Sequence, residues 1–147
     1  MKRNSQLAQT LHALLHMAEH DGPLTSEELG ACFDTNPVVI RRTLAGLREA
    51  GLVASGGGRG GGWSLSRPLE KISLRDVYRA LGAPEFFHVG PRIASSPCLI
   101  DHAVADAMAG AFDEAQALLL KRLTEITLAD IAADYSRRAR KAKRHAS

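Results

Sequence analysis

Arginine side chains gather in one stretch of the chain, and their chemistry is that of anion recognition. Residues 36–67 contain arginines at positions 41, 42, 48, 59 and 67 against the single acid Glu49, a local net charge of +4. A guanidinium donates forked hydrogen bonds that match phosphate groups and guanine edges. Because a local basic patch attracts polyanions, this stretch favours nucleic-acid binding.

The rest of the charge is divided just as unevenly. The 147 residues carry a net charge of +3, but residues 137–147 hold six Lys or Arg and no acid. Residues 1–136 therefore carry −3, and residues 83–136 carry −5. Charge clusters are common in proteins, and a solvated basic surface without a ligand is the alternative to a binding patch.

The two cysteines differ in their expected surroundings. Cys98 follows Pro97 at the expected start of a long helix, where the helix dipole favours the thiolate and makes the residue a possible redox sensor. The alternative is a small apolar residue buried at a helix cap. Cys32 ends a short apolar segment and is expected in the core.

Histidines raise the question of a metal site. His12, His16 and His20 recur every four residues, so they share the helix side opposite the leucines. A solvated histidine stripe is favoured over a zinc or nickel site, since no carboxylate or cysteine is fixed beside it. His88, Cys98 and His102 form a looser set with the same interpretation, and no metal site is predicted.

Catalytic motifs are missing from the sequence. There is no nucleophile elbow, no HExxH and no Walker pattern, so an enzyme is not expected. Gly56, Gly58 and Gly61 formally match a dinucleotide-binding fingerprint, which requires a helix to begin at the glycines. The segment after them, Trp63-Ser-Leu-Ser-Arg-Pro, is not helical in character, and the glycines are read instead as a flexible hairpin tip.

Composition places the chain among globular proteins. Hydrophobic residues make up 45% and charged residues 24%, and no apolar run is long enough to cross a membrane. The N-terminus lacks the pattern of a secretory signal, and two distant cysteines suit a reducing compartment. A cytoplasmic protein with no membrane partner is expected.

The elements that position the arginines follow from periodicity and capping signals. Helices are expected at residues 5–20, 25–32 and 36–50, the last with Asn36 as N-cap and Gly51 after its end. Strands at 52–55 and 63–66 form a hairpin, and Ser73 begins a fourth helix at 74–81. This mainly α chain with a small β-hairpin is typical of a winged helix-turn-helix.

A long apolar periodicity follows. Residues 98–126 predict one helix, which a small domain cannot cover, and it is expected to pair with a copy of itself. The alternative is a helix that lies back on its own domain. The predicted dimer interface is formed by Val104, Met108, Phe112, Ala115, Leu119, Leu123 and Ile126.

The chain is accordingly divided into a winged helix-turn-helix at 1–82, a linking loop at 83–97, dimerisation helices at 98–136, and a basic tail at 137–147 that is expected to be disordered. A short helix to about Tyr135 is expected to precede the tail, because Thr127 and Asp130 form a capping pattern. A disordered basic tail would add phosphate contacts of no sequence preference.

The third helix is the expected reader of DNA, since the helix after the tight turn enters the major groove in this class. Arg41 and Arg42 are the best candidates for base contacts, although solvated surface arginines are the alternative. The full predicted DNA-binding set is Ser26, Thr35, Asn36, Val38, Val39, Arg41, Arg42, Arg48 and Arg59.

Three motifs together resemble the Rrf2 family of bacterial transcription regulators. They are Leu-Arg-Glu-Ala-Gly-Leu-Val at 47–53, Gly-Gly-Trp-Ser-Leu at 61–65, and Ser-Leu-Arg-Asp-Val at 73–77. The resemblance extends over nearly the whole chain, since the family also ends in a long dimerisation helix and a short helix. It implies a homodimeric regulator, usually a repressor, that reads a pseudo-palindrome in double-stranded DNA with the third helix and the wing.

Two departures from the family limit what the resemblance implies. Family members often carry an arginine early in the wing, where this chain has Gly57, and Arg59 follows two residues later. Cluster-binding members hold three close cysteines near the start of the long helix, where only Cys98 stands here. Because one thiolate cannot anchor an iron-sulfur cluster, the chain resembles a clusterless branch, with no cofactor expected.

The predicted function is a homodimeric DNA-binding repressor that responds to redox conditions or to a small molecule through the Cys98 region. Phe86, Phe87 and His88 in the linking loop could line a pocket for an unknown effector. The alternative is a winged-helix module that mediates association with another protein.

Overall fold

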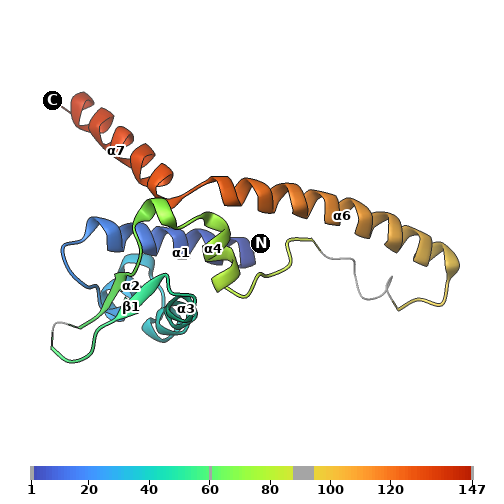
Figure 1. Cartoon of the computed structure of the whole chain (residues 1–147), viewed down its shortest axis with the longest axis horizontal. Helices are drawn as coiled ribbons and strands as arrows, with labels where there is room; N and C mark the ends of the chain where they lie inside the picture. Colours follow the sequence, from blue (N-terminus) through green and yellow to red (C-terminus); the bar gives the residue numbers. More distant parts are fainter. Residues whose placement is uncertain (1, 60, 88–94, 147) are drawn as a thin grey trace.

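The computed structural model describes residues 2–59, 61–87 and 95–146, with side chains from residue 6 onward. It is mainly helical with one two-stranded sheet (Figure 1). The elements in order are α1 (Lys2–Glu19), α2 (Ser26–Phe33), α3 (Pro37–Glu49), β1 (Val53–Ser55), β2 (Trp63–Leu65), the 3-10 helix η1 (Leu69–Lys71), α4 (Leu74–Ala80), α6 (Leu99–Glu125) and α7 (Leu128–His145). This order confirms the winged-helix fold class expected from the sequence.

Reciprocal side-chain caps begin three of the helices. Thr25 caps α2 and receives the Glu28 carboxylate in return, with Thr25 N–H to Oε2 at 2.7 Å. Ser73 with Asp76 does the same for α4, and Thr127 does it for α7. Each reciprocal cap satisfies backbone N–H donors that would otherwise lack a partner at the start of the helix.

The third helix has the boundaries that its sequence predicts. The side chain of Asn36 accepts a hydrogen bond from Val38 N–H at 2.9 Å, and Pro37 takes the first helical position. Gly51 follows the end of α3 with φ of +73°, a left-handed conformation that glycine adopts without steric cost. The chain can therefore turn directly from α3 into the hairpin.

One hydrophobic core holds α1, α2, α3, the hairpin and α4 together. Its fully buried side chains include Leu14, Leu29, Leu44, Leu47, Leu52, Val53, Ile72, Val77 and Leu128. Each of these helices contributes one apolar face, and Leu128 at the start of α7 completes the core. The packed core fixes the orientation of α3 relative to the hairpin.

The hairpin carries a third paired segment that the sequence did not reveal. β1 and β2 are antiparallel, with Val53 opposite Leu65 and Ser55 opposite Trp63. Leu24, in the connection between α1 and α2, exchanges two backbone hydrogen bonds with Trp63, at 3.0 and 2.7 Å. Gly62 lies so close to Leu24 that an added Cβ would be 2.7 Å from its carbonyl oxygen. The base of the hairpin is therefore attached to the helical domain.

The long helix α6 leaves the domain as a separate arm (Figure 1). It packs on α4 near its C-terminal end, where Thr124 Oγ1 accepts from Arg75 Nη1 at 3.3 Å. A backbone bridge between Ser73 and Thr127 attaches the joint between α6 and α7 to the start of α4. Across the described ranges, no helix has both the length and the apolar character of a membrane span.

The prediction of a disordered tail at 137–147 is wrong, because α7 continues to His145. Asp134 pairs with Arg137 at 3.1 Å and with Arg138 at 2.6 Å, which offsets the repulsion between the first cations. The later cations lie near the helix C-terminus, where the dipole favours positive charge. Cys32 also differs from its prediction, because it is exposed at the end of α2.

Candidate nucleic-acid interface

One face of α3 is exposed along its length and carries both apolar and basic side chains. Val38 and Val39 are 54% and 51% exposed, although valines are usually buried. Arg41 and Arg42 follow them and are exposed as well. The opposite face, with Leu44 and Leu47, is fully buried in the core. The helix therefore presents methyl groups and guanidinium groups together to the surroundings.

The turn between α2 and α3 holds this face at a fixed angle. Asp34 ends α2 in the left-handed conformation, with φ of 49°. Gly30 permits the close approach of the turn that follows α2, since an added Cβ would be 2.6 Å from the Thr35 carbonyl oxygen. The hydroxyl of Thr35 is half-buried and donates to the Phe33 carbonyl at 3.1 Å. This pair of helices is the expected helix-turn-helix.

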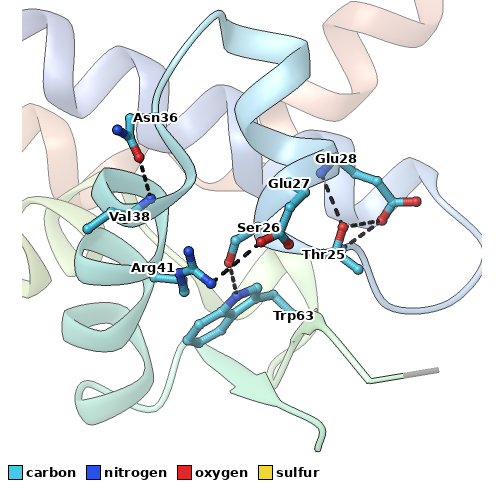
Figure 2. Close-up of polar contacts among 8 residues, drawn as sticks. All are labelled: Thr25, Ser26, Glu27, Glu28, Asn36, Val38, Arg41 and Trp63. Atoms are coloured by element: carbon cyan, nitrogen blue, oxygen red, sulfur yellow. Dashed lines mark hydrogen bonds and ion pairs between the residues drawn. The ribbon is translucent and has the colours of Figure 1, made fainter. Parts of the chain in front are cut away.

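The two candidate base readers have different surroundings. Arg41 Nη1 lies 3.5 Å from Glu27 Oε1 on α2, and both side chains are exposed (Figure 2). Arg42 makes no hydrogen bond or ion pair with any residue that the structure describes. To contact an anion, Arg41 must therefore leave the Glu27 carboxylate or share its donors with it, whereas all donors of Arg42 are available.

Arg48 connects α3 to the hairpin. Its Nη1 donates to Ser55 Oγ at 3.1 Å, and its guanidinium lies 5.8 Å from the Trp63 ring centroid. A cation over the face of an indole is attracted by the ring quadrupole. Arg48 is still exposed, so it can hold the hairpin in place and face an anion with its remaining donors.

Ser26 is inside the domain rather than on the predicted DNA-binding surface. It is 4% exposed, and its Oγ accepts a hydrogen bond from Trp63 Nε1 at 2.9 Å (Figure 2). Trp63 is itself 8% exposed. Ser26 was predicted to bind DNA, but its hydroxyl is buried and attaches the hairpin to α2, so the hydroxyl is not available for that contact.

Asn36 has a similar structural use of its side chain. Its Oδ1 caps α3, which leaves only the amide NH₂ free to donate to a ligand.

Arg59 is exposed beside Gly58, whose φ is +76°, in the turn that joins β1 to β2. A basic side chain thus stands at the end of the hairpin that is remote from the core.

Cys98 is the N-cap residue of α6 and is exposed. Its side chain makes no capping hydrogen bond, but the backbone N–H groups of Asp101 and Ile100 favour the thiolate and hold the pKa of the Cys98 thiol below its ordinary value. His102 lies one turn further along α6, and its Nε2 is 2.7 Å from the Ser96 carbonyl oxygen. The predicted position of Cys98 at the helix start is confirmed, while its role as a sensor stays a prediction.

The residues present do not fit an iron-sulfur cluster. The chain has two cysteines, of which Cys98 begins α6 and Cys32 ends α2. Within the part of the chain that the structure describes, no three His, Cys, Asp or Glu side chains are grouped as a metal site. His12 and His16 face each other with their Nε2 atoms 3.0 Å apart, and His88 lies outside the described residues. The absence of a cofactor stays a prediction.

The residues predicted to form the dimer interface differ in their exposure. Val104 is 41% exposed, and Ala115 is exposed too, as a self-association face requires. Phe112 stacks on Phe87 of the same chain at 5.3 Å between ring centroids. Leu123 is 8% exposed, so its assignment to a partner contact is wrong, because the end of α6 that carries it packs on α4.

The periodicity missed the most exposed apolar side chains of α6. Leu99, Ile100 and Leu118 are 83%, 74% and 70% exposed. Met108, Leu119 and Ile126 of the predicted set are half-buried. The high leucine and alanine content of the helix could have indicated that its apolar surface is wider than one stripe.

Comparisons with known proteins agree with this architecture. YwnA of Bacillus subtilis (strain 168), named as an HTH-type transcriptional regulator, is 30% identical over 87% of this chain and 95% of its own. The crystal structure of a transcriptional regulator from Lactobacillus plantarum has a TM-score of 0.72 at 27% identity, over 88% of this chain and 89% of that one. T. potens IscR has a TM-score of 0.62 at 25% identity, over 84% and 80%.

The family comparison extends over almost the full length. Residues 3–134 match the Rrf2 family, which is described as an iron-dependent transcriptional regulator. The members are regulators and not enzymes, in agreement with the absence of catalytic motifs. With its winged helix-turn-helix and its long α6, this chain belongs to the Rrf2 family of transcriptional regulators and has a DNA-binding fold.

Proposed function

We propose that the protein is a homodimeric repressor in the cytoplasm that binds a pseudo-palindromic operator in double-stranded DNA. The observation that carries this proposal is the α3 face, where exposed methyl and guanidinium groups stand together on a helix whose other side is locked in the core. A helix of this kind fits the major groove, where each base pair presents a distinct pattern.

The side chains of this α3 face and of the hairpin have different roles in the proposed complex. Arg41 and Arg42 read base edges, since a guanidinium donates two hydrogen bonds to guanine. Val38 and Val39 contact thymine methyl groups, which accounts for two valines exposed by more than half. Thr35, Asn36 and Arg48 hold phosphates, and Arg59 reaches the backbone or the minor groove from the hairpin.

Self-association uses the free length of α6. Its 27 residues extend about 40 Å at 1.5 Å per residue, and the helix packs on its own domain only near one end. Ile100, Val104 and Leu118, which share one side of α6, would lose solvent contact against a second copy. Two-fold pairing places two α3 helices for half-sites in successive turns of the DNA.

The response to a signal arises in the segment that joins the winged helix-turn-helix to α6. Tyr78 stacks on Phe86 at 4.7 Å, and Phe87 stacks on Phe112 at 5.3 Å, so the same loop contacts both α4 and α6. Cys98 lies at the start of α6 beside this loop in sequence, with its thiolate form favoured. Oxidation of Cys98, or a small effector among these aromatic rings, would shift α6 and change the half-site spacing.

Electrophoretic mobility shifts with DNA from upstream of the coding region, at several salt concentrations and with or without peroxide, test the proposal. Sequence-preferring binding that peroxide weakens supports a redox-responsive regulator, and a Cys98→Ser variant should then keep its DNA on peroxide treatment. Preferential binding that ignores peroxide points to a small-molecule effector instead. Equal affinity for random DNA would favour the alternative of a protein-association module.

A further inference from the structure

The final turns of α7 carry a row of cations that lie outside the winged helix-turn-helix. Arg137, Arg140, Lys141 and Arg144 are spaced three or four residues apart, which places them on one side of the helix. These four residues form the basic stripe. They are exposed and, together with Lys143, they line a shallow groove on the helix surface.

Most of the positive charge of the stripe is not neutralised within the chain. Arg137 pairs with Asp134, the last acid of the sequence. Arg140, Lys141 and Arg144 make no ion pair with the residues that the structure describes. Three solvated cations held in a row by a helix form a preorganised site for a linear array of negative charges.

The spacing of the stripe matches the backbone of a nucleic acid. Residues 137 to 144 span about 10 Å along the helix axis, at 1.5 Å per residue. One strand of duplex DNA presents a phosphate about every 3.4 Å of its axis, so the stripe is long enough to contact about two to three neighbouring phosphates. The acids of α6 are sparser, since Asp101, Asp106, Asp113, Glu114 and Glu125 are spread over the 27 residues of that helix.

The surroundings of the stripe disfavour a membrane as its ligand. Residues 136–147 contain Ser, Arg, Ala, Lys and His only, without a large apolar side chain. A helix that binds in the membrane interface buries leucines or aromatic rings beneath its cations. A phosphate backbone requires no such anchor.

The direction of α7 separates the stripe from α3. The first turns of α7 pack on η1 and α1, and its later turns extend beyond the domain. In Figure 1, α7 leaves on the side of α1 that faces away from α3 and the hairpin. A disordered tail could fold back towards α3 of its own chain, but a helix that is anchored at Leu128 and continues to His145 cannot.

We propose that the basic stripe binds the phosphate backbone of a second duplex segment, separate from the one that α3 reads. One protein molecule can then hold two segments of DNA together. The stripe binds without sequence preference, because it contacts phosphates and no base edges. The inference goes beyond sequence-specific repression and does not require α3 to read bases.

A charge-matched pair of full-length variants tests the stripe. The stripe variant is Arg140→Gln/Lys141→Gln/Arg144→Gln, in which glutamine preserves helix propensity. The control is Lys71→Gln/Arg79→Gln/Lys121→Gln, which removes three exposed cations from other elements. A third variant, Arg140→Lys/Arg144→Lys, retains the charge. Helix content by circular dichroism and molar mass by light scattering accompany each variant.

The readouts are capture and salt dependence. Protein bound to an immobilised 30-base-pair duplex is offered a second, fluorescent duplex of random sequence. We expect capture by the wild type, the control and the lysine variant, and its loss in the stripe variant. For random duplex, the plot of log affinity against log salt has a negative slope. In the stripe variant this slope should become shallower by about 2 to 3, since each phosphate contact contributes about 0.9.

Other outcomes identify other ligands and overturn the proposal. Capture and slope unchanged in the stripe variant would show that the stripe binds no DNA. A halved molar mass would show that the stripe contacts the acidic α6 of a second copy. Binding to phosphatidylserine vesicles but not to random duplex would assign it to a membrane. Arg42→Ala should leave capture intact, so failure of sequence reading is distinguishable from failure of the stripe.

Discussion

The indole nitrogen of Trp63 donates a hydrogen bond to the Ser26 hydroxyl over 2.9 Å, and both residues are buried. This bond joins β2 of the hairpin to the first turn of α2. Together with the backbone bridge between Leu24 and Trp63, it makes the hairpin part of the helix-turn-helix. A hairpin held in this way keeps its angle to α3, which two-part recognition of DNA requires.

Removal of the Ser26 hydroxyl should destabilise the domain. Ser26→Ala leaves the buried Trp63 N–H without its acceptor, at a cost of about 1 to 3 kcal/mol in the free energy of unfolding. Urea unfolding measures the loss. Ser64→Ala, in the same hairpin, is the matched control, because no described residue hydrogen-bonds its hydroxyl, and it should change stability little. Equal losses in the two variants would contradict the role of the bond.

Release of Arg41 should strengthen DNA binding. Glu27→Gln removes the carboxylate 3.5 Å from Arg41 Nη1 and a negative charge near the phosphates. Because exposed ion pairs contribute about 0.2 to 1 kcal/mol, affinity should rise by up to about fivefold at low salt. Fluorescence anisotropy with a short duplex measures it, with Glu70→Gln as the control on η1. The gain should vanish in Arg41→Ala, and a weaker Glu27→Gln complex would refute the assignment.

Local signals in the sequence predicted most of the fold. Asn36 caps α3 and Gly51 follows it, as expected, because each acts within a few residues of its own position. The bond between Ser26 and Trp63 joins residues 37 positions apart, and no periodicity or cap connects them. The exposed arginines of α3 were therefore predictable, whereas the attachment of the hairpin was not.

The two errors in the C-terminal part have a common cause. Charge density alone suggested disorder after Tyr135, but Asp134 offsets Arg137 and Arg138 and the helix continues. Periodicity placed Leu123 on the apolar face of α6 but could not say whether α4 or a partner covers it. Both outcomes depend on neighbours in space.

The low thiol pKa of Cys98 predicts early deprotonation as pH rises. Backbone N–H groups of Asp101 and Ile100 stabilise the thiolate, so iodoacetamide should label Cys98 with an apparent pKa below the ordinary value of about 8.5. The rate is measured against pH in Cys32→Ser protein, folded and in urea. The thiolate contribution to stability is present above the unfolded pKa and disappears as pH falls through the folded one. Coincident plots of labelling rate against pH for the folded and the urea-unfolded protein would show that the fold does not lower the pKa of Cys98.

A charge on the exposed face of α6 should separate the proposed dimer. Leu118 is 70% exposed in one chain, and a partner would bury it. Leu118→Glu should raise the dimer dissociation constant at least about tenfold, because an unpaired charge would lose water. Analytical ultracentrifugation measures this. Ala117→Glu adds the same charge on the side away from Val104 and should stay dimeric, and a dimeric Leu118→Glu protein would show that another surface mediates assembly.

Sequence reading by α3 is tested most directly by the ratio of affinities for selected and random DNA. Duplexes selected by the wild-type protein from a random pool serve as the probe, with Arg79→Ala as a control outside the interface. The wild-type ratio should reach about 10³ or more, and Arg42→Ala should lower it by about 1 to 3 kcal/mol, from fivefold to more than a hundredfold. If Arg42→Ala weakens both complexes equally, or if no sequence is selected, α3 does not read bases.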